Sequence, residues 1–201
     1  MLRKAKRRKT AELAYIVGVA LGDGNLSNPN GRAVRLRVSC DAKYPNLINR
    51  IQQVIQKSFP NNKVSKVLKP RNCVDVSCYS NEWEQILGWQ AKKGPKHKQN
   101  ADIPKWVFSK KKYLVNCIKG LIETDGSVYT DRGYKMVMFV SVISGLANSV
   151  YNGIKILGFE PHLYKLENQR NQDGFPKQTL YHVRVSKNTE NFLNLIQPNK
   201  N

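Results

Sequence analysis

Two apolar stretches of the chain end in the same way, on an aspartate followed by a glycine. Residues 14–24 read Ala-Tyr-Ile-Val-Gly-Val-Ala-Leu-Gly-Asp-Gly, and residues 118–126 read Ile-Lys-Gly-Leu-Ile-Glu-Thr-Asp-Gly. Both are typical of a buried helix. Small residues recur four positions apart, Gly18 with Gly22 and Gly120 with Thr124, so each pair lies on one helix face. The pattern predicts two helices whose backbones pack closely against each other.

The aspartates that end these stretches, Asp23 and Asp125, lie where a carboxylate is unfavourable. In the last turn of a helix a negative charge faces the negative end of the helix dipole, which costs about 0.3–1 kcal/mol. A single acid of this kind is adequately explained as incidental to a core helix. Two at matching places predict that the carboxylates have a function.

Between and after these stretches, hydrophobic periodicity predicts further helices and strands. The segment 32–40 alternates cleanly, with apolar side chains on one face and Arg35 and Arg37 on the other, which indicates a half-buried strand with a basic open face. In the first half we expect helices at 11–22, at 45–59 and after Ser80, and strands at 25–27, 32–40, 63–69 and 72–79. In the second half we expect helices at 110–124, after Ser144 and near Phe192, and strands at 127–130, 134–142, 159–167 and 179–186.

The order of elements is therefore the same in both halves, and so is the spacing of their apolar residues. Val74 and Val76 recur as Val183 and Val185 at a constant separation. The sequence predicts an α/β protein of the α+β type: a pseudo-twofold tandem repeat of αββαββα units, with two antiparallel β-sheets around a central pair of packed helices. The expected parts are a basic N-terminal tail (1–9), a first half (10–87), a linker (88–104) and a second half (105–201).

Charge narrows the class of partner. The chain of 201 residues has 34 Lys and Arg against 14 Asp and Glu, a formal net charge of +20. Such a surface favours nucleic acid as the partner. A membrane surface is the weaker alternative, since basic and apolar residues do not separate along one helix, and no apolar run approaches the length of a membrane span.

The cysteines and the start of the chain bear on the compartment. The four cysteines lack the spacing of metal ligands, so buried thiols in a reducing compartment are expected and a zinc site is not. No signal peptide is visible, and we expect an intracellular, cytoplasmic protein, with an organelle as the alternative.

The paired acids suggest a chemistry. If the two glycine-bearing helices pack on the pseudo-twofold axis, Asp23 and Asp125 meet at its end, and their mutual repulsion is relieved by a cation between them. A hard divalent ion such as Mg²⁺ is the expected occupant. Metal held between carboxylates and a phosphodiester fits a metal-dependent nuclease, and a twofold arrangement fits duplex DNA.

The two motifs, residues 14–24 and 118–126, resemble the signatures of the LAGLIDADG homing endonucleases, and the chain is similar to the compact monomeric members with two motifs. The resemblance implies a monomeric endonuclease that makes double-strand breaks in a long pseudo-palindromic DNA site, with the two sheets forming a DNA-binding saddle in the major groove. It implies Mg²⁺, or another divalent cation such as Mn²⁺, bound by Asp23 and Asp125 with the carbonyls of Gly22 and Thr124. It places Lys98 as an active-site lysine, with Lys200 as the candidate in the second half.

Polar residues of the expected strands and turns are candidates for DNA contact. They are Asn25, Ser27, Arg35, Arg37, Lys66, Lys69, Arg71, Tyr79, Tyr129, Arg132, Lys135, Lys165 and Arg184. The strand at 134–142 is apolar on both faces, and a one-residue slip would exchange them, so its groove-facing set stays open. At the strand ends where the family often has a glutamine or asparagine that orients a water, this chain has Cys40-Asp41 and Ser141-Val142.

Other functions fit the same charge and repeat. One is an RNA maturase that acts on its own intron RNA, and another is a DNA-binding regulator that does not cleave. A basic RNA-associated protein is a third, disfavoured by the repeat. Retention of both Asp23 and Asp125 favours cleavage, because a pure binding protein does not need paired carboxylates next to phosphate.

Overall fold

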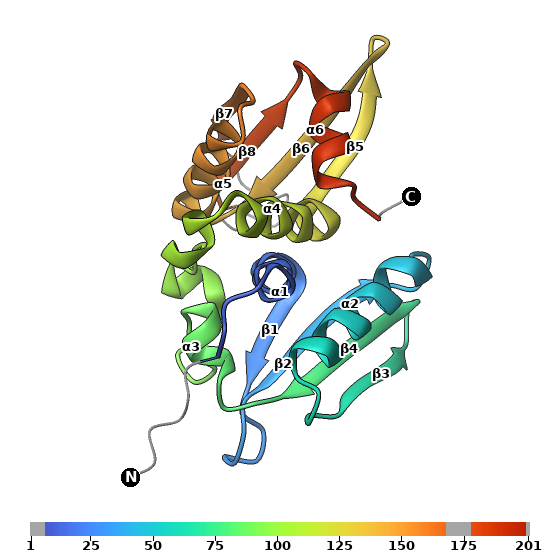
Figure 1. Cartoon of the computed structure of the whole chain (residues 1–201), viewed down its shortest axis with the longest axis vertical. Coiled ribbons are helices and arrows are strands. Elements are labelled where there is room, and N and C mark those ends of the chain that lie inside the picture. The colour runs from blue at the N-terminus through green and yellow to red at the C-terminus, as the bar shows by residue number, and fades with distance from the viewer. Residues whose placement is uncertain (1–6, 168–177, 200–201) are drawn as a thin grey trace, which may run out of the picture.

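The chain folds into two similar halves that pack against each other through one helix from each (Figure 1). The computed structural model describes residues 7–167 and 178–199. The first half consists of α1 (Ala11–Asp23), β1 (Gly24–Ser27), β2 (Arg35–Asp41), α2 (Pro45–Ser58), β3 (Val64–Lys69), β4 (Cys73–Tyr79) and α3 (Trp83–Leu87). The second consists of α4 (Lys111–Asp125), β5 (Gly126–Asp131), β6 (Tyr134–Ser141), α5 (Ser144–Ile156), β7 (Pro161–Leu166), β8 (Leu180–Val185) and α6 (Thr189–Ile196).

This order confirms the predicted duplication of an αββαββα unit. Each half has a four-stranded antiparallel sheet, in the order β1-β2-β4-β3 and β5-β6-β8-β7, so the connectivity is the same in both. Two short 3₁₀ turns, Lys96–Gln99 and Lys105–Ser109, lie between the halves. The predicted loop at 168–177, part of the basic tail (1–6) and Lys200 lie outside the described residues.

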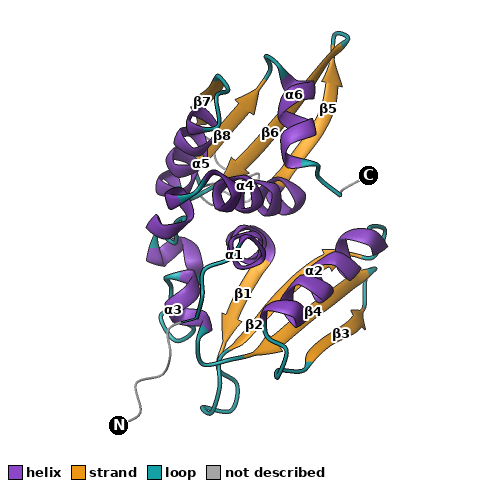
Figure 2. Ribbon diagram, in the orientation of Figure 1, coloured by secondary structure: helices purple, strands orange, loops and turns teal. Residues whose placement is uncertain are grey.

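Each sheet is covered by helices on one side only (Figure 2). In the first half α2 packs on β3 and β4, and in the second half α5 packs on β6, β7 and β8 while α6 packs on β6. The faces that carry no helix are called the open faces below. Because every apolar side chain of β2 at an even position is buried, as Leu36 and Val38 show, the helix-covered side of the sheet contains the core.

The central helices α1 and α4 lie side by side between the two sheets (Figure 1). Glycine allows this close approach. A Cβ atom added to Gly120 would lie 2.6 Å from the carbonyl oxygen of Tyr15, and one added to Gly18 would overlap the carbonyl of Cys117. The predicted face of small residues is therefore the helix–helix interface.

The starts of the helices differ in how they are capped. Thr10 caps α1, its Oγ1 accepting from the Leu13 amide at 3.1 Å. Ser109 does not cap α4, because it ends a 3₁₀ turn and donates instead to the Trp106 carbonyl at 2.6 Å. Ser144 likewise lies inside α5 rather than before it. These differences move helix starts by one residue and leave the fold unchanged.

The described residues contain no helix that is long and apolar enough to cross a bilayer. The prediction of buried thiols is confirmed for Cys40, Cys78 and Cys117 and is wrong for Cys73, which is half-buried; all four are free cysteines. Burial raises the pKa of the Cys78 thiol to about 11, so it is uncharged at neutral pH.

Candidate metal centre and nucleic-acid interface

The acids that the sequence singled out are the last residues of the two central helices. Asp23 ends α1 and Asp125 ends α4, and a strand begins directly after each. The glycines that follow do not have the left-handed conformation of an ordinary helix stop, since Gly24 and Gly126 have φ of −81° and −96°. They are needed because the chain folds back over the last helical turn. A Cβ atom at Gly126 would lie 2.5 Å from the Ile122 carbonyl oxygen.

The two helix ends meet, which brings the carboxylates to one place. A Cβ atom at Gly22 would overlap the hydroxyl of Thr124 and would lie 3.4 Å from the carboxyl carbon of Asp125. The Asp125 side chain therefore lies against the end of α1, beside Asp23. Asp23 is exposed and Asp125 is half-buried, so the pair faces solvent from a rigid, buried helix pair.

A lysine from between the two halves lies at the same place. The Lys96 ammonium donates to the carbonyl oxygen of Gly22, and its Nζ lies 3.5 Å from that of Ala20. Burial lowers the pKa of Lys96, while the charges of Asp125 and Asp23 oppose this shift. The predicted active-site lysine, Lys98, is exposed. Of these two lysines, Lys96 is therefore the one whose ammonium contacts the end of α1 and lies within reach of the charges of both aspartates.

The atoms gathered here suit a hard cation. They are carboxylate oxygens of Asp23 and Asp125 and the carbonyl oxygen of Gly22, which already accepts a hydrogen bond from a positive charge. Oxygen donors of this kind are the ligands of Mg²⁺ and Mn²⁺. Within the described ranges 7–167 and 178–199 no group of three or more His, Cys, Asp or Glu side chains that could hold a metal ion is found, so protein side chains offer only the two carboxylates here. The arrangement therefore fits the predicted divalent cation.

The strand end nearest to the acids has no amide side chain. Cys40 is buried, and burial together with the charge of Asp23 raises the pKa of its thiol to about 12. Asp41, the next residue, pairs with Lys43 at 2.9 Å. In the second half Ser141 is buried, and its Oγ accepts from the Ile143 amide at 3.1 Å. A thiol and a hydroxyl thus lie where the resemblance implies an amide.

The open face of the first sheet has the predicted polar character. Arg37 of β2 is opposite Asn25 of β1 and Ser77 of β4, and paired residues of a sheet share a face. The carboxylate of Asp75 lies 4.0 Å from the Arg37 guanidinium and accepts from the Ser39 hydroxyl at 2.7 Å. Six of the predicted DNA-contact residues lie on this open face: Asn25, Ser27, Arg35, Arg37, Lys69 and Tyr79. Arg71 lies in the turn beyond β3.

Three predicted contact residues lie on the other side of their sheets. Lys66 pairs with Val76, a core residue, and donates to Asn49 of α2 at 3.0 Å. Lys135 and Lys165 share the helix-covered side of the second sheet. These three candidates for DNA contact therefore lie on the side that the helices cover, because a long lysine side chain reaches solvent from either face of a strand.

The structure shows which side chains of β6, the strand that is apolar on both faces, point to the open face. Val137 and Phe139 point into the core, so Met136, Met138 and Val140 point to the open face. Tyr129 and Arg184 lie on that face as predicted, and Arg132 lies in the β5–β6 turn with φ of 49°.

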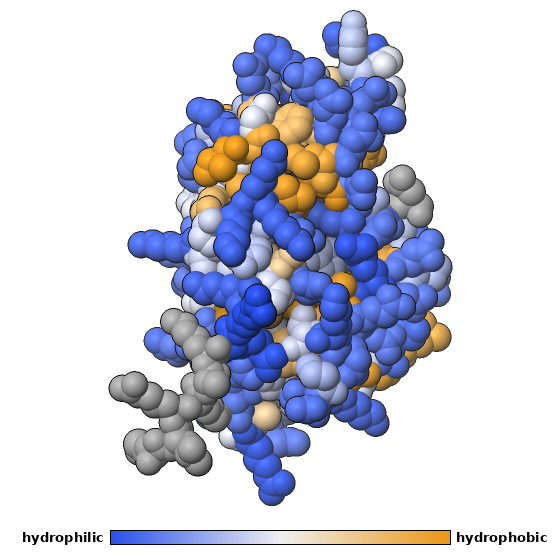
Figure 3. All heavy atoms as spheres, in the orientation of Figure 1, coloured by the Kyte–Doolittle hydropathy of each residue, from blue (hydrophilic) through white to orange (hydrophobic). Residues whose placement is uncertain are grey.

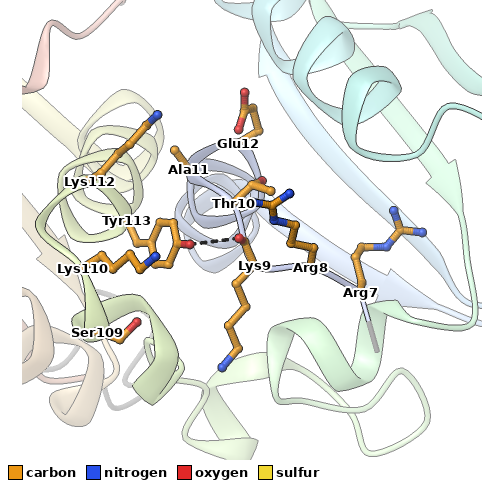
Figure 4. A pocket seen from close by; sticks show the side chains of 10 residues that line it. All are labelled: Arg7, Arg8, Lys9, Thr10, Ala11, Glu12, Ser109, Lys110, Lys112 and Tyr113. Atoms are coloured by element: carbon orange, nitrogen blue, oxygen red, sulfur yellow. Dashed lines mark hydrogen bonds between the residues drawn. The ribbon is translucent and has the colours of Figure 1, made fainter. Parts of the chain in front are cut away.

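A separate basic cleft lies at the opposite ends of the central helices (Figure 4). It is lined by the described part of the predicted tail, Arg7, Arg8 and Lys9, and by Lys110 and Lys112 from the start of α4. α1 has 13 residues, which separates this cleft from the acids by about 20 Å at 1.5 Å per residue. On the helix-covered side most of the surface is hydrophilic, apart from an apolar area over the second half (Figure 3).

Comparison with known proteins supports the fold in both halves. The family model for a LAGLIDADG-like domain matches residues 112–197, which run from α4 to α6. A crystal structure of I-DmoI in complex with DNA and Mn has a TM-score of 0.64 at 17% identity, covering 92% of this chain and 96% of that one. Among curated proteins, no sequence matches this chain.

The fold also occurs in WhiA. The full-length DUF199/WhiA from Thermatoga maritima has a TM-score of 0.61 at 12% identity, and the match covers 97% of this chain and 57% of that one. The N-terminal LAGLIDADG domain of DUF199/WhiA has a TM-score of 0.58 at 13% identity, covering 96% and 86%. The predicted resemblance is thus confirmed: the second half matches a LAGLIDADG-like domain, and the whole chain has the two-repeat LAGLIDADG fold of the homing endonuclease I-DmoI.

Proposed function

We propose that the protein is a site-specific homing endonuclease that makes metal-dependent double-strand breaks in a long pseudo-palindromic DNA target. The observation that carries the proposal is the convergence of Asp23, Asp125 and Lys96 at the joined ends of α1 and α4. The structurally similar I-DmoI has been crystallised with DNA and Mn and with DNA and Ca, and a variant of it with its target DNA in the presence of Mg, which supports DNA and divalent cations as ligands here.

The residues of the site have separate roles in this proposal. Asp23 and Asp125, with the Gly22 and Thr124 carbonyls, would hold Mg²⁺ or Mn²⁺. When bound, such an ion stabilises the charge that develops on the attacking and leaving oxygens of a phosphodiester. Lys96 offsets negative charge on the scissile phosphate. Because burial lowers its pKa, it also gives up a proton to a leaving oxygen more readily than a surface lysine does.

The rigid helix pair fixes the distance between the two acids, and so determines where the two strands are cut. Each acid is followed by the first strand of its sheet, so the open faces extend outward from the cleavage centre on both sides. One chain supplies both halves, so a monomer is sufficient for a site with approximate twofold symmetry.

A second function has one specific observation in its favour. The cleft lined by Arg7, Arg8, Lys9, Lys110 and Lys112 lies at the opposite ends of α1 and α4 from the acids, about 20 Å away along the helices. It favours a further nucleic-acid contact, as an RNA maturase bound to its own intron RNA would make. A regulator that does not cleave is disfavoured by the paired acids, although WhiA shows that the fold is not confined to homing endonucleases.

The test is cleavage of a randomised plasmid library, with Mg²⁺ and without divalent metal, followed by sequencing of the ends. We expect discrete double-strand breaks at one long site, only with metal. The Asp23→Asn variant serves as the matched control for contaminating nuclease. Tight DNA binding without cuts in Mg²⁺, Mn²⁺ or Ca²⁺ would exclude the endonuclease and favour the alternatives.

A further inference from the structure

The open faces of the two sheets have equivalent geometry. In the first half Gly24 pairs with Val38, and in the second half Gly126 pairs with Phe139, so these residues occupy equivalent places. The strands can then be matched position by position. Val76 of β4 pairs with Val38 and is equivalent to Val183 of β8, which pairs with Phe139. The match of Val76 with Val185 that the sequence spacing predicted is therefore wrong by two residues, because the pairing with the neighbouring strand fixes the equivalent position.

The chemistry at these equivalent places is different. Along the middle of the first open face β2 presents Arg35, Arg37 and Ser39; the equivalent residues of β6 are Met136, Met138 and Val140. Every hydrogen-bonding side chain of β2 on this face is thus replaced by an apolar one. Lys69 is likewise replaced by Leu166, which is 46% exposed.

Met136, Met138 and Val140 form an apolar strip along β6, and neighbouring aromatic side chains enlarge it. Tyr129 and Tyr134 flank it and are 37% and 69% exposed. The ring of Tyr164 stacks on His182 at a centroid distance of 5.1 Å, and its hydroxyl donates to the Met138 sulfur at 3.7 Å. The Tyr164 hydroxyl thus contacts the Met138 sulfur and orients that side chain on the open face.

The position of this strip indicates its occupant. β5 starts directly after Asp125, and Arg184 pairs with Met138 in the middle of the face, so the strip is continuous with the acids and includes a positive charge. Such a face suits duplex DNA. In the major groove, arginine pairs best with guanine, whereas apolar side chains contact the C5-methyl group of thymine.

We propose that the second half reads its DNA half-site through thymine methyl groups packed on Met136, Met138 and Val140, so that this half-site is rich in A·T pairs. The first half reads its own half-site by hydrogen bonds from Arg35 and Arg37. This inference rests on the proposed function, because it concerns the DNA bound at the same saddle. It gives the two half-sites different base compositions despite the duplicated fold.

The experiment starts from a duplex selected for binding from a random library in Ca²⁺. In one half-site at a time, every thymine is replaced by deoxyuracil, which removes the C5-methyl group and leaves base pairing intact. We expect the affinity to fall about fourfold for each contacted methyl group in one half-site, and to stay constant in the other. The Met138→Ala variant should lose this sensitivity, and Met138→Leu should keep it, because leucine restores the apolar contact.

A matched variant in the first sheet shows which half-site each sheet binds. Arg37→Ala should relax base preference only in the half-site that is insensitive to deoxyuracil. Equal sensitivity of both half-sites, or none in either, would overturn the inference while leaving DNA binding and the proposed function in place. If the library yields no bound duplex, the proposed function fails and the inference fails with it.

Discussion

Helices α1 and α4 occupy equivalent places in the two repeats, but they are held there by different interactions. Every residue of α1 from Leu13 to Gly22 is buried, and all of them are apolar or small except Tyr15. α4 contains two buried charged residues, Lys119 and Glu123, in its corresponding buried stretch. The first helix is therefore fixed by close packing and the second by a polar network as well.

The network around Glu123 links the two halves and the end of the chain. Glu123 is fully buried; it accepts from the Tyr15 hydroxyl at 2.6 Å and from the Asn199 amide at 2.7 Å. Its carboxylate lies 3.8 Å from the Lys119 ammonium, which donates to the Gln197 carbonyl. Burial, and then the charge of Glu123, raise the pKa of Tyr15, so the phenol stays protonated. Repeated backbones thus need not carry repeated chemistry.

We expect substitutions of Asp23 and of Asp125, the last residues of α1 and α4, to have similar effects. In the proposed endonuclease, Asp23→Asn and Asp125→Asn would each remove one charged ligand of the metal ion with little change of shape, so either should lower the rate of double-strand cleavage by more than about a hundredfold. DNA binding should persist, since phosphate contacts come from other residues. Initial rates on the selected target, with binding measured in parallel, test this. Full activity in either variant would show that the two helix ends are not equivalent.

Loss of one carboxylate should destabilise the fold more in α4, where it belongs to the buried network around Glu123, than in α1. Glu123→Gln leaves the Lys119 charge without its partner and should lower the free energy of unfolding by about 3 kcal/mol. Glu12→Gln, which weakens the solvent-exposed ion pair to Lys57, is the matched change in α1 and should cost less than about 1 kcal/mol. Urea denaturation at neutral pH measures both. Equal losses would mean that the network does not distinguish α4 from α1.

Substitution of the glycines at the helix contact should destabilise the fold equally in α1 and α4. Gly18→Ala and Gly120→Ala insert a methyl group against the facing backbone, so each should destabilise the fold by about 2 kcal/mol. Gly145→Ala is the control, because a Cβ there meets nothing within 4 Å and alanine favours the helix by about 0.5–1 kcal/mol. Thermal melts of the three variants check the prediction. An unchanged melting temperature for Gly18→Ala would contradict the close helix contact.

The smallest expected stability effect concerns the lysine between the halves. Lys96→Met removes a poorly solvated charge and should raise the free energy of unfolding by about 1 kcal/mol, while slowing cleavage by about a hundredfold. Lys98→Met alters an exposed residue two positions away and should change neither. Paired melts and cleavage rates decide. If Lys98→Met slowed cleavage as much, the assignment of Lys96 would be wrong.

The sequence predicted what depends on local periodicity. The spacing of Gly18 and Gly120 predicted the helix contact, and the alternation of β2 predicted its open face correctly. β6 is apolar on both sides, so its facing depended on packing against α5 and α6, which no local pattern contains. The Glu123 network was missed, although Lys119 and Glu123, four residues apart in an apolar stretch, were a visible signal.

Lys96 and Lys98 show a second limit. Both lie in the same basic, glycine- and proline-containing segment, and only the direction of one 3₁₀ turn decides which ammonium reaches the Gly22 carbonyl. Lys66, Lys135 and Lys165 show the same limit on strands. A long flexible side chain can reach solvent from either face of a strand, so a lysine in the sequence does not show which face it occupies.

The contact between Gly22 and Thr124 has a consequence for the two motifs. These residues occupy the same place in the two motifs, and the threonine fills the space that a side chain at position 22 would need. A homodimer of the second half would place threonine against threonine at the tightest point, and one of the first half would leave a gap there. With threonine at position 124, position 22 has room only for glycine. The two motifs are therefore complementary at this contact, and neither can replace the other without a clash or a gap.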